Sequence, residues 1–206
     1  MEPKDKILQG AESLFLKYGF KSITMDDIAR ELGVSKKTLY QYFEDKNDLV
    51  NQVIEAHINF DMQNCNKLID SGCDPVAFLI EVSKSITENH RKANVSVLFD
   101  LKKYFKPSWE RLEKFKSEFI YNQMVTNIRQ GKELGLYRNE INTELTAKLY
   151  VHSVEFMMRP ELYQEIITDF HQMHFEIVKY HLRAICTEKG LKKLEKLIEN
   201  QHNNTK

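Results

Sequence analysis

The scarcity of helix breakers is the feature that most constrains how this chain can fold. Only seven glycines and four prolines occur in 206 residues, and most of them separate segments whose apolar residues recur at steps of three and four. Ile7, Ala11 and Phe15, for example, mark one face of a helix. No segment shows the strict alternation that is typical of a half-buried strand. The sequence therefore predicts an all-α protein.

Glycine, proline and capping residues set the limits of the predicted helices. Ser35 and Asp45 are expected N-caps, because their side chains can accept a free backbone N–H. A turn is predicted at 131–135, and Pro160 is expected at a helix start. The predicted helices cover residues 7–18, 25–32, 36–42, 46–70, 78–86, 95–105, 107–124, 143–156, 162–186 and 189–199, and a frayed polar tail is expected at 201–206.

Composition narrows the class of protein. The chain is 42% hydrophobic, which is enough to fill a core, and it has no apolar run of the ~20 residues that a spanning helix needs. The N-terminus lacks the apolar block of a secretory signal, so a cytoplasmic protein without a membrane anchor is expected. Three widely spaced cysteines (Cys65, Cys73 and Cys186) fit reduced, inert thiols better than a disulfide framework or a redox sensor.

Three short predicted helices fall within the first 42 residues. The last two are joined by the tight turn Leu32-Gly33-Val34-Ser35, which forces the helices to cross steeply. The small Ala29 allows close packing, and Leu39 is expected to face inward with Phe43. This is the arrangement of a helix-turn-helix, whose second helix lies in the DNA major groove.

The segment TMDDIARELGVSKKTLYQYFEDKNDLV, from Thr24 to Val50, resembles the DNA-binding signature of the TetR family of bacterial transcriptional repressors. Ala11, Phe15 and Gly19 in the preceding helix also match. The resemblance covers about the first quarter of the chain. It implies a DNA-binding domain at 1–50 and a larger helical domain for effector binding and dimerisation at 51–200.

The resemblance also implies which residues contact DNA. The candidates for base contact are Lys36, Lys37, Thr38 and Gln41, since lysine can donate to guanine, glutamine can pair with adenine and a threonine methyl can touch thymine. The candidates for phosphate contact are Thr24, Tyr40, Tyr42 and Lys46. Free backbone donors at the start of the helix after Asp45 could bind a further phosphate.

Charge is the feature that fits least well with a DNA-binding protein. The chain is neutral, with 30 basic and 30 acidic residues. Asp26 and Asp27 stand where many family members have a basic or hydroxyl residue, and Asp26 is expected to cap its helix or to weaken non-specific binding. The positive charge useful for DNA is expected only at Arg30, Lys36, Lys37 and Lys46.

The larger domain offers two further sets of candidate residues. Aromatic and other side chains that could line an effector pocket are Phe78, Phe99, Tyr104, Trp109, Phe119, Tyr121, Met124, His152 and Phe156, although each taken alone is more often ordinary core. His171, His174 and His181 recur on one helix face; we interpret them as solvated or interface residues, because no third metal ligand follows at a suitable spacing. No cofactor or metal is expected.

We therefore expect a homodimeric, ligand-responsive repressor that binds a palindromic operator, with an unknown small molecule as effector. The resemblance implies that helices near 143–158 and 162–186 pair with their symmetry mates. Two alternatives remain open. One is a helical adaptor or small-molecule-binding protein of the same fold that no longer binds DNA, and the other is an all-α enzyme, for which the sequence contains no supporting motif.

Overall fold

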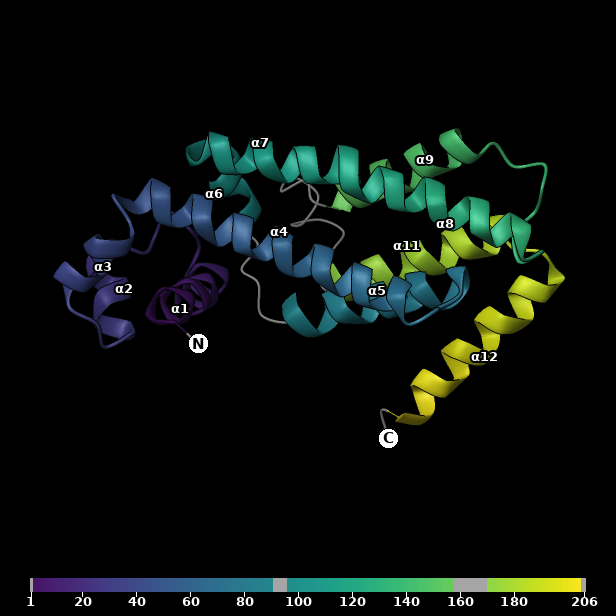
Figure 1. Ribbon diagram of the computed structural model, residues 1–206, viewed down its shortest axis with the longest axis horizontal. Helices are drawn as coiled ribbons and strands as arrows, with labels where there is room; N and C mark the ends of the chain where they lie inside the picture. Colours follow the sequence, from purple (N-terminus) through teal and green to yellow (C-terminus); the bar gives the residue numbers. More distant parts are fainter. Residues whose placement is uncertain (1, 91–95, 158–169, 205–206) are drawn as a thin grey trace. The chain divides into compact units, whose positions relative to one another are not determined.

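The computed structural model describes residues 2–90, 96–157 and 170–204, and within them all regular secondary structure is helical, as predicted. An isolated β-bridge joins Tyr137 and Cys186. No helix in these ranges is both long and apolar enough to cross a membrane. The helices are α1 (Pro3–Tyr18), α2 (Met25–Glu31), α3 (Lys36–Tyr42), α4 (Lys46–Asp70), α5 (Pro75–His90), α6 (Ser96–Tyr104), α7 (Lys106–Lys114), a π-helical segment (Phe115–Ile120), α8 (Tyr121–Glu133), α9 (Thr143–Met157), α11 (Phe170–Ile185) and α12 (Glu188–Asn204) (Figure 1).

The chain forms two compact units. Unit 1 contains α1 to α3, α4 as far as Met62, α6 and α7, and unit 2 contains the remainder of α4, α5, α8, α9, α11 and α12. The sequence predicts a boundary between the DNA-binding domain and the larger domain near residue 50. That boundary is one of function, and it stays a prediction.

Aromatic side chains build the core of unit 1 around α1. The rings of Phe15 and Phe20 lie 4.8 Å apart, and the ring of Phe105 lies 5.8 Å from that of Phe20. All three are buried. Phe105 precedes α7, so these contacts fix the α6–α7 connection against the turn that follows α1.

The core of unit 2 is a cluster of buried side chains from α5, α8, α9, α11 and α12. Its members include Val76, Leu79, Ile80, Ile128, Ala147, Val178, Leu182 and Leu194. Burying side chains of this size contributes about 1.5–3 kcal/mol each before the entropy cost of folding. Leu194 anchors α12, and Leu191 and Leu197 of the same helix pack against the cluster.

The turn predicted at 131–135 is wrong at its first three residues, because α8 continues through Gly131 to Glu133. A Cβ at Gly131 would stand 2.0 Å from Cδ2 of Tyr137, so glycine serves close packing here and not a turn. The Tyr137 ring is fixed in turn, since its hydroxyl donates to Asn127 Oδ1 (3.0 Å) and Asn127 Nδ2 donates to the Pro75 carbonyl (2.9 Å). The chain turns later, at Gly135, whose φ of 66° favours glycine.

Backbone hydrogen bonds join the α8–α9 connection to the α11–α12 connection. The N–H of Arg138 donates to the Ile185 carbonyl (2.9 Å), and the N–H of Thr187 donates to the Leu136 carbonyl (2.9 Å). The Thr187 hydroxyl also donates to the Gly135 carbonyl (2.8 Å). We call these contacts the clasp. They give hydrogen-bond partners to loop groups that would otherwise need water.

Several helix ends differ from the prediction. α5 begins at Pro75 instead of 78, because Asp74 Oδ1 accepts from the N–H groups of Val76 (3.1 Å) and Ala77 (3.3 Å). α12 was expected to end at 199, but its backbone stays helical to Asn204, which no glycine or proline prevents. Pro160 and the predicted helical residues 162–169 lie outside the described residues.

Candidate nucleic-acid interface

Capping hydrogen bonds fix the start of α2. The hydroxyl oxygen of Thr24 accepts from the N–H of Asp27 (3.1 Å), and Asp27 Oδ2 accepts from the N–H of Thr24 (3.0 Å). This reciprocal pair is a capping box. The carboxylate that caps the helix is therefore that of Asp27, and the expectation that Asp26 would do so is wrong.

The turn between α2 and α3 has the geometry expected of a helix-turn-helix. Gly33 has a φ of 64°, and the N–H of Val34 donates to the Ala29 carbonyl (3.0 Å). Ser35 caps α3 as predicted, with its hydroxyl oxygen accepting from the N–H of Thr38 (3.0 Å). Leu39 is fully buried. The inner faces of α2 and α3 thus pack together and leave the outer face of α3 to solvent.

That outer face carries most of the side chains predicted to contact DNA. Lys36, Lys37, Tyr40 and Gln41 are exposed, and Thr38 is half-buried. The Thr38 hydroxyl lies 2.7 Å from that of Ser35, so its methyl group is the part left to contact a base. Phe43 is buried, as the sequence predicted.

Two of the four cations expected to serve DNA already have carboxylate partners. Lys36 Nζ lies 2.7 Å from Asp26 Oδ1, which joins α3 to α2. Arg30 Nη2 lies 2.6 Å from Asp27 Oδ1. The hydrogen bond to Asp26 raises the pKa of Lys36, and the hydrogen bonds from Thr24, followed by Arg30, lower the pKa of Asp27. The positive charge of the helix-turn-helix is thus partly neutralised within the protein.

The remaining candidates for phosphate contact differ in their burial and in the hydrogen bonds that they form within the protein. The Thr24 hydroxyl is engaged in the capping box. Tyr42 is half-buried, and its ring centroid lies 6.4 Å from that of Phe43. Lys46 Nζ donates to the Lys21 carbonyl (3.3 Å), and burial lowers the pKa of this lysine.

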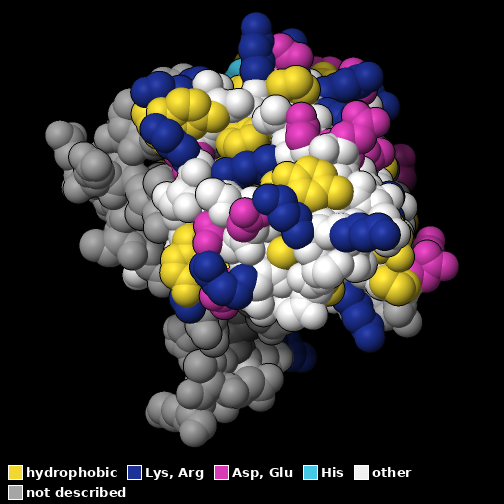
Figure 2. All heavy atoms as spheres, turned by 90° about the vertical axis from the view of Figure 1, so that its left-hand side faces the viewer, with side chains coloured by type: hydrophobic (Ala, Val, Ile, Leu, Met, Phe, Trp, Pro, Cys, Tyr) yellow, Lys and Arg dark blue, Asp and Glu magenta, His cyan; other side chains and the backbone are white. Residues whose placement is uncertain are grey.

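The first turn of α4 is capped much as the sequence predicted. Asp45 Oδ1 accepts from the N–H of Asp48 (2.8 Å), and Asp48 Oδ2 accepts from the N–H of Glu44 (3.0 Å). Asp45 therefore takes one of the free backbone donors of this turn, and binding of a phosphate to the others stays a prediction. On the face shown in Figure 2, lysine and arginine side chains stand among acidic and hydrophobic ones and form no uniform basic surface.

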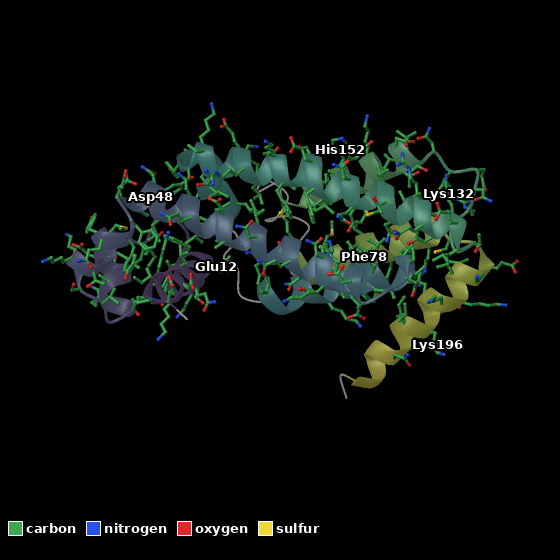
Figure 3. All side chains as sticks on the ribbon, viewed as in Figure 1. Glu12, Asp48, Phe78, Lys132, His152 and Lys196 are labelled. Carbon is green, nitrogen blue, oxygen red and sulfur yellow. The ribbon has the colours of Figure 1, made fainter. Side chains whose placement is uncertain are left out.

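The nine side chains predicted to line an effector pocket fall in both units. Phe99, Tyr104 and Trp109 belong to unit 1, and the other six belong to unit 2. Within unit 2, Phe78 and Met124 are buried in the core and Tyr121 packs against it, whereas the exposed His152 pairs with Glu155 at 2.7 Å (Figure 3). Phe119 is half-buried and Phe156 is exposed. The pocket itself stays a prediction.

Two histidines of α11, His174 and His181, are buried, so the expectation that they are solvated is wrong for these two, and the interface alternative stays a prediction. His174 Nδ1 and the Ser83 hydroxyl form a buried hydrogen bond (3.0 Å). His181 is buried with its ring 5.0 Å from that of Tyr150, and burial lowers its pKa to about 4. The side chain of His171 lies outside the described residues. No group of side chains in the described ranges could hold a metal ion.

The three cysteines are free thiols. Burial raises the pKa of Cys186 to about 12 and that of Cys73 above its ordinary value. Because the thiolate is the reactive form, these two side chains have the character of inert thiols.

Unit 1 thus contains a helix-turn-helix of the DNA-binding class. It consists of a capped helix, a glycine turn and a second helix with a polar outer face. The sequence profile of bacterial regulatory proteins of the tetR family matches residues 7–53. The uncharacterized HTH-type transcriptional regulator YvaF of Bacillus subtilis (strain 168) is 31% identical over 160 residues, which cover 76% of this chain and 81% of that protein. This chain belongs to the TetR family of helix-turn-helix transcriptional regulators.

Solved structures share the fold over most of the chain. A transcriptional regulator from Cytophaga hutchinsonii ATCC 33406 has a TM-score of 0.69 at 24% identity and covers 89% of this chain and 98% of its own. The complex of SmeT with triclosan has a TM-score of 0.67 at 16% identity and covers 90% of this chain and 92% of its own. The helical part beyond the residues that the family profile matches therefore also has the fold of known regulators.

The Asp26–Lys36 pair gives a first testable prediction. In the variant Asp26→Asn, Lys36 loses its partner and becomes available to phosphate, so we expect affinity for a random-sequence duplex to rise about threefold to tenfold. The dependence of log affinity on log salt concentration should become steeper by about 0.9, as expected when one more phosphate is neutralised. Fluorescence anisotropy at a series of KCl concentrations measures both quantities.

Glu31→Gln is the matched control for this experiment. It removes the same charge from the same helix, but Glu31 is exposed and forms no ion pair with Lys36. An equal rise in both variants would show that overall charge, and not release of Lys36, controls non-specific binding.

Proposed function

We propose that this chain is a homodimeric transcriptional repressor that binds a palindromic operator through α3 and responds to a small-molecule effector. The observation that carries the proposal is the exposed polar face of α3, held by the Ser35 cap and the buried Leu39. Lys36, Lys37, Thr38 and Gln41 are the proposed base contacts, and Thr24, Tyr40, Tyr42 and Lys46 are the proposed phosphate contacts. The target is DNA, so the proposed place of action is the cytoplasm, and no catalytic role is proposed.

Exposed apolar side chains on α9 and α11 support the proposed dimer. Leu145, Leu149 and Phe156 recur at helical spacing on α9 and are 57%, 60% and 42% exposed, and Tyr180 of α11 is 79% exposed. Apolar surface at this spacing is typical of a helix face that packs against another helix. If α9 and α11 pair with the same helices of a second protomer, these side chains become buried on both protomers.

The proposed effector site lies in the helical part beyond the helix-turn-helix. SmeT, which has the same fold, is bound to triclosan in its structure. By analogy we place the site in unit 2, among the six of the nine predicted side chains that belong to it, of which Phe78, Tyr121 and Met124 lie within or against its core. The effector must bind the DNA-free state better than the DNA-bound state, since equal affinity for both would shift nothing.

The double variant Lys37→Ala/Tyr42→Ala tests the DNA-binding surface. Duplexes are first selected from a random pool with the wild-type protein, and the enriched sequence serves as operator. We expect the variant to bind this operator about 10- to 100-fold more weakly in a gel shift, because each protomer then lacks one side chain proposed to touch a base and one proposed to touch a phosphate.

The double variant Lys192→Ala/Lys196→Ala, which removes exposed lysines of α12, is the control and should bind normally. Unchanged specific affinity of Lys37→Ala/Tyr42→Ala would remove the assignment of these two residues. Failure of the wild-type protein to enrich any duplex would favour an adaptor that has lost DNA binding.

A further inference from the structure

Unit 1 carries a second cluster of lysines that lies outside the helix-turn-helix. It is formed by the turn between α1 and α2, the start of α4 and the end of α6. We call it the lysine–aromatic surface and define it by Lys21, Lys46, Lys102 and Lys103 with the rings of Phe99 and Tyr104. Residues 99–104 are distant in sequence from the other members, and the packing of Phe105 against Phe20 brings them together.

Two exposed rings on α6 hold two of these lysines. Lys21 Nζ donates to the Tyr104 hydroxyl (3.0 Å) and lies 4.6 Å from the centroid of its ring. Lys103 Nζ lies 5.3 Å from the Tyr104 ring and 5.1 Å from the Phe99 ring. Phe99 and Tyr104 are 44% and 40% exposed. Cation–π contacts of this kind hold an ammonium group in place and leave its charge uncompensated.

The other two lysines extend the surface toward α3 and α7. Lys46, which follows α3, has its Nζ 5.8 Å from the Phe105 ring and donates to the Lys21 carbonyl. Lys102 Nζ lies 5.6 Å from the Trp109 ring. Lys46 is also one of the proposed phosphate contacts, so the surface is continuous with the proposed DNA-binding site.

The charge of this surface differs from that of the helix-turn-helix. Arg30 and Lys36 are paired with carboxylates at 2.6 and 2.7 Å. Among the described side chains, no carboxylate lies within ion-pair distance of the ammonium groups of Lys21, Lys46, Lys102 or Lys103. Asp100 lies buried beneath the surface, where its Oδ2 accepts from the N–H of Lys21 (2.9 Å). The lysine–aromatic surface thus carries four ammonium groups without an ion-pair partner among the described side chains, and Asp100 acts on those of Lys21 and Lys46 only at longer range.

From this geometry we propose that the lysine–aromatic surface binds the sugar–phosphate backbone of operator DNA next to the half-site that α3 contacts. Phosphate oxygens suit the unpaired ammonium groups, and the exposed rings offer apolar area to the deoxyribose. The inference rests on the DNA-binding function proposed above. It explains how a neutral chain, whose helix-turn-helix pairs Arg30 and Lys36 with its own carboxylates, supplies further positive charge for DNA affinity.

The test uses the full chain carrying Lys102→Ala/Lys103→Ala. The probes are the duplex selected by the wild-type protein, flanked by extra base pairs on both sides, and a form trimmed to its half-sites. For the flanked duplex we expect about tenfold weaker binding and a salt dependence shallower by about 0.9 for each phosphate that the variant no longer neutralises. Lys103→Arg should retain most of the wild-type affinity and its salt dependence, because a guanidinium keeps the positive charge and can also lie over an aromatic ring. The α12 variant Lys192→Ala/Lys196→Ala controls for the loss of two positive charges elsewhere.

The outcomes separate this inference from the function on which it rests. If the wild-type protein selects no duplex, the DNA-binding function itself fails, and this inference fails with it. If the wild-type protein binds and the double variant shows the same affinity and salt dependence, the surface serves another partner and the inference alone is overturned. Weaker binding with an unchanged salt dependence would also overturn it, since removing an ammonium group from a phosphate must change that slope.

Discussion

Leu145→Glu/Leu149→Glu is expected to convert the protein to a monomer and to lower its operator affinity by about 10²- to 10⁴-fold. The two leucines lie one turn apart on α9 and are 57% and 60% exposed, so the folded protomer does not need them for its own core. In a dimer through α9 and α11, both protomers would bury these carboxylates against apolar side chains, with no positively charged partner for any of them. Two linked half-sites bind far more tightly than one, and that advantage disappears with the dimer.

Analytical ultracentrifugation and a gel shift with the selected operator measure the two effects. Leu134→Glu is the matched control: it is the same substitution at a leucine that is 51% exposed but lies outside α9 and α11. It should leave both dimer and affinity unchanged. A dimer that survives Leu145→Glu/Leu149→Glu with its affinity intact would show that another surface joins the protomers.

Gly131→Ala is expected to destabilise the protein by about 1–3 kcal/mol, although the same substitution in an unobstructed helix would stabilise it by about 1 kcal/mol. The added Cβ would stand 2.0 and 2.3 Å from two ring atoms of Tyr137, a side chain that is fully buried. The ring has little room to move, because its hydroxyl is bonded to Asn127. For a chain of this size, thermal denaturation should show a Tm lower by about 2–12 °C.

A double-mutant cycle isolates the cause of this loss. In a Tyr137→Leu background the ring is absent, so Gly131→Ala should cost little or become stabilising. Gly72→Ala provides a comparison, because its φ of 72° strains alanine while nothing lies within 4 Å of the new Cβ, so a loss of about 1–2 kcal/mol is expected. Additive losses for Gly131→Ala and Tyr137→Leu would contradict the proposed clash.

The features that sequence reasoning predicted correctly depend on neighbours in the chain. Ser35 caps α3 and Asp45 caps α4, as expected, because a cap requires only a hydroxyl or carboxylate beside the first free N–H groups. The spacing of apolar residues likewise predicts which faces of α2 and α3 point inward. The all-α fold was predictable because helical periodicity is itself a local property.

The errors arose where a distant residue decides the outcome. The sequence predicts a turn at Gly131, but the role of this glycine depends on the ring of Tyr137, six residues later, which folds back onto α8. Asp26 was expected to cap a helix, but Lys36 from the next helix takes its carboxylate. His174 and His181 are buried by the helices around α11, which the polarity of their side chains does not indicate.

The candidate site was predictable only in part for the same reason. Lys36, Lys37 and Gln41 were placed on the outer face of a short helix from spacing alone. Lys102 and Lys103 were not, because only the packing of α6 in unit 1 places them near Lys21 and Lys46. Neither the helical periodicity of α6 nor the composition of the chain contains that information.

The clasp sets an order in which the chain can fold during its synthesis. Leu136 and Arg138 leave the ribosome early, but their backbone partners at Ile185 and Thr187 leave close to the end. Domains form from the N-terminus as translation proceeds, so α1 to α3, α4 as far as Met62, α6 and α7 can pack as unit 1 while unit 2 still lacks α11 and α12. A nascent chain would therefore complete its DNA-binding end before the helices proposed to form the dimer, and pairing of two chains would be the last step of its maturation.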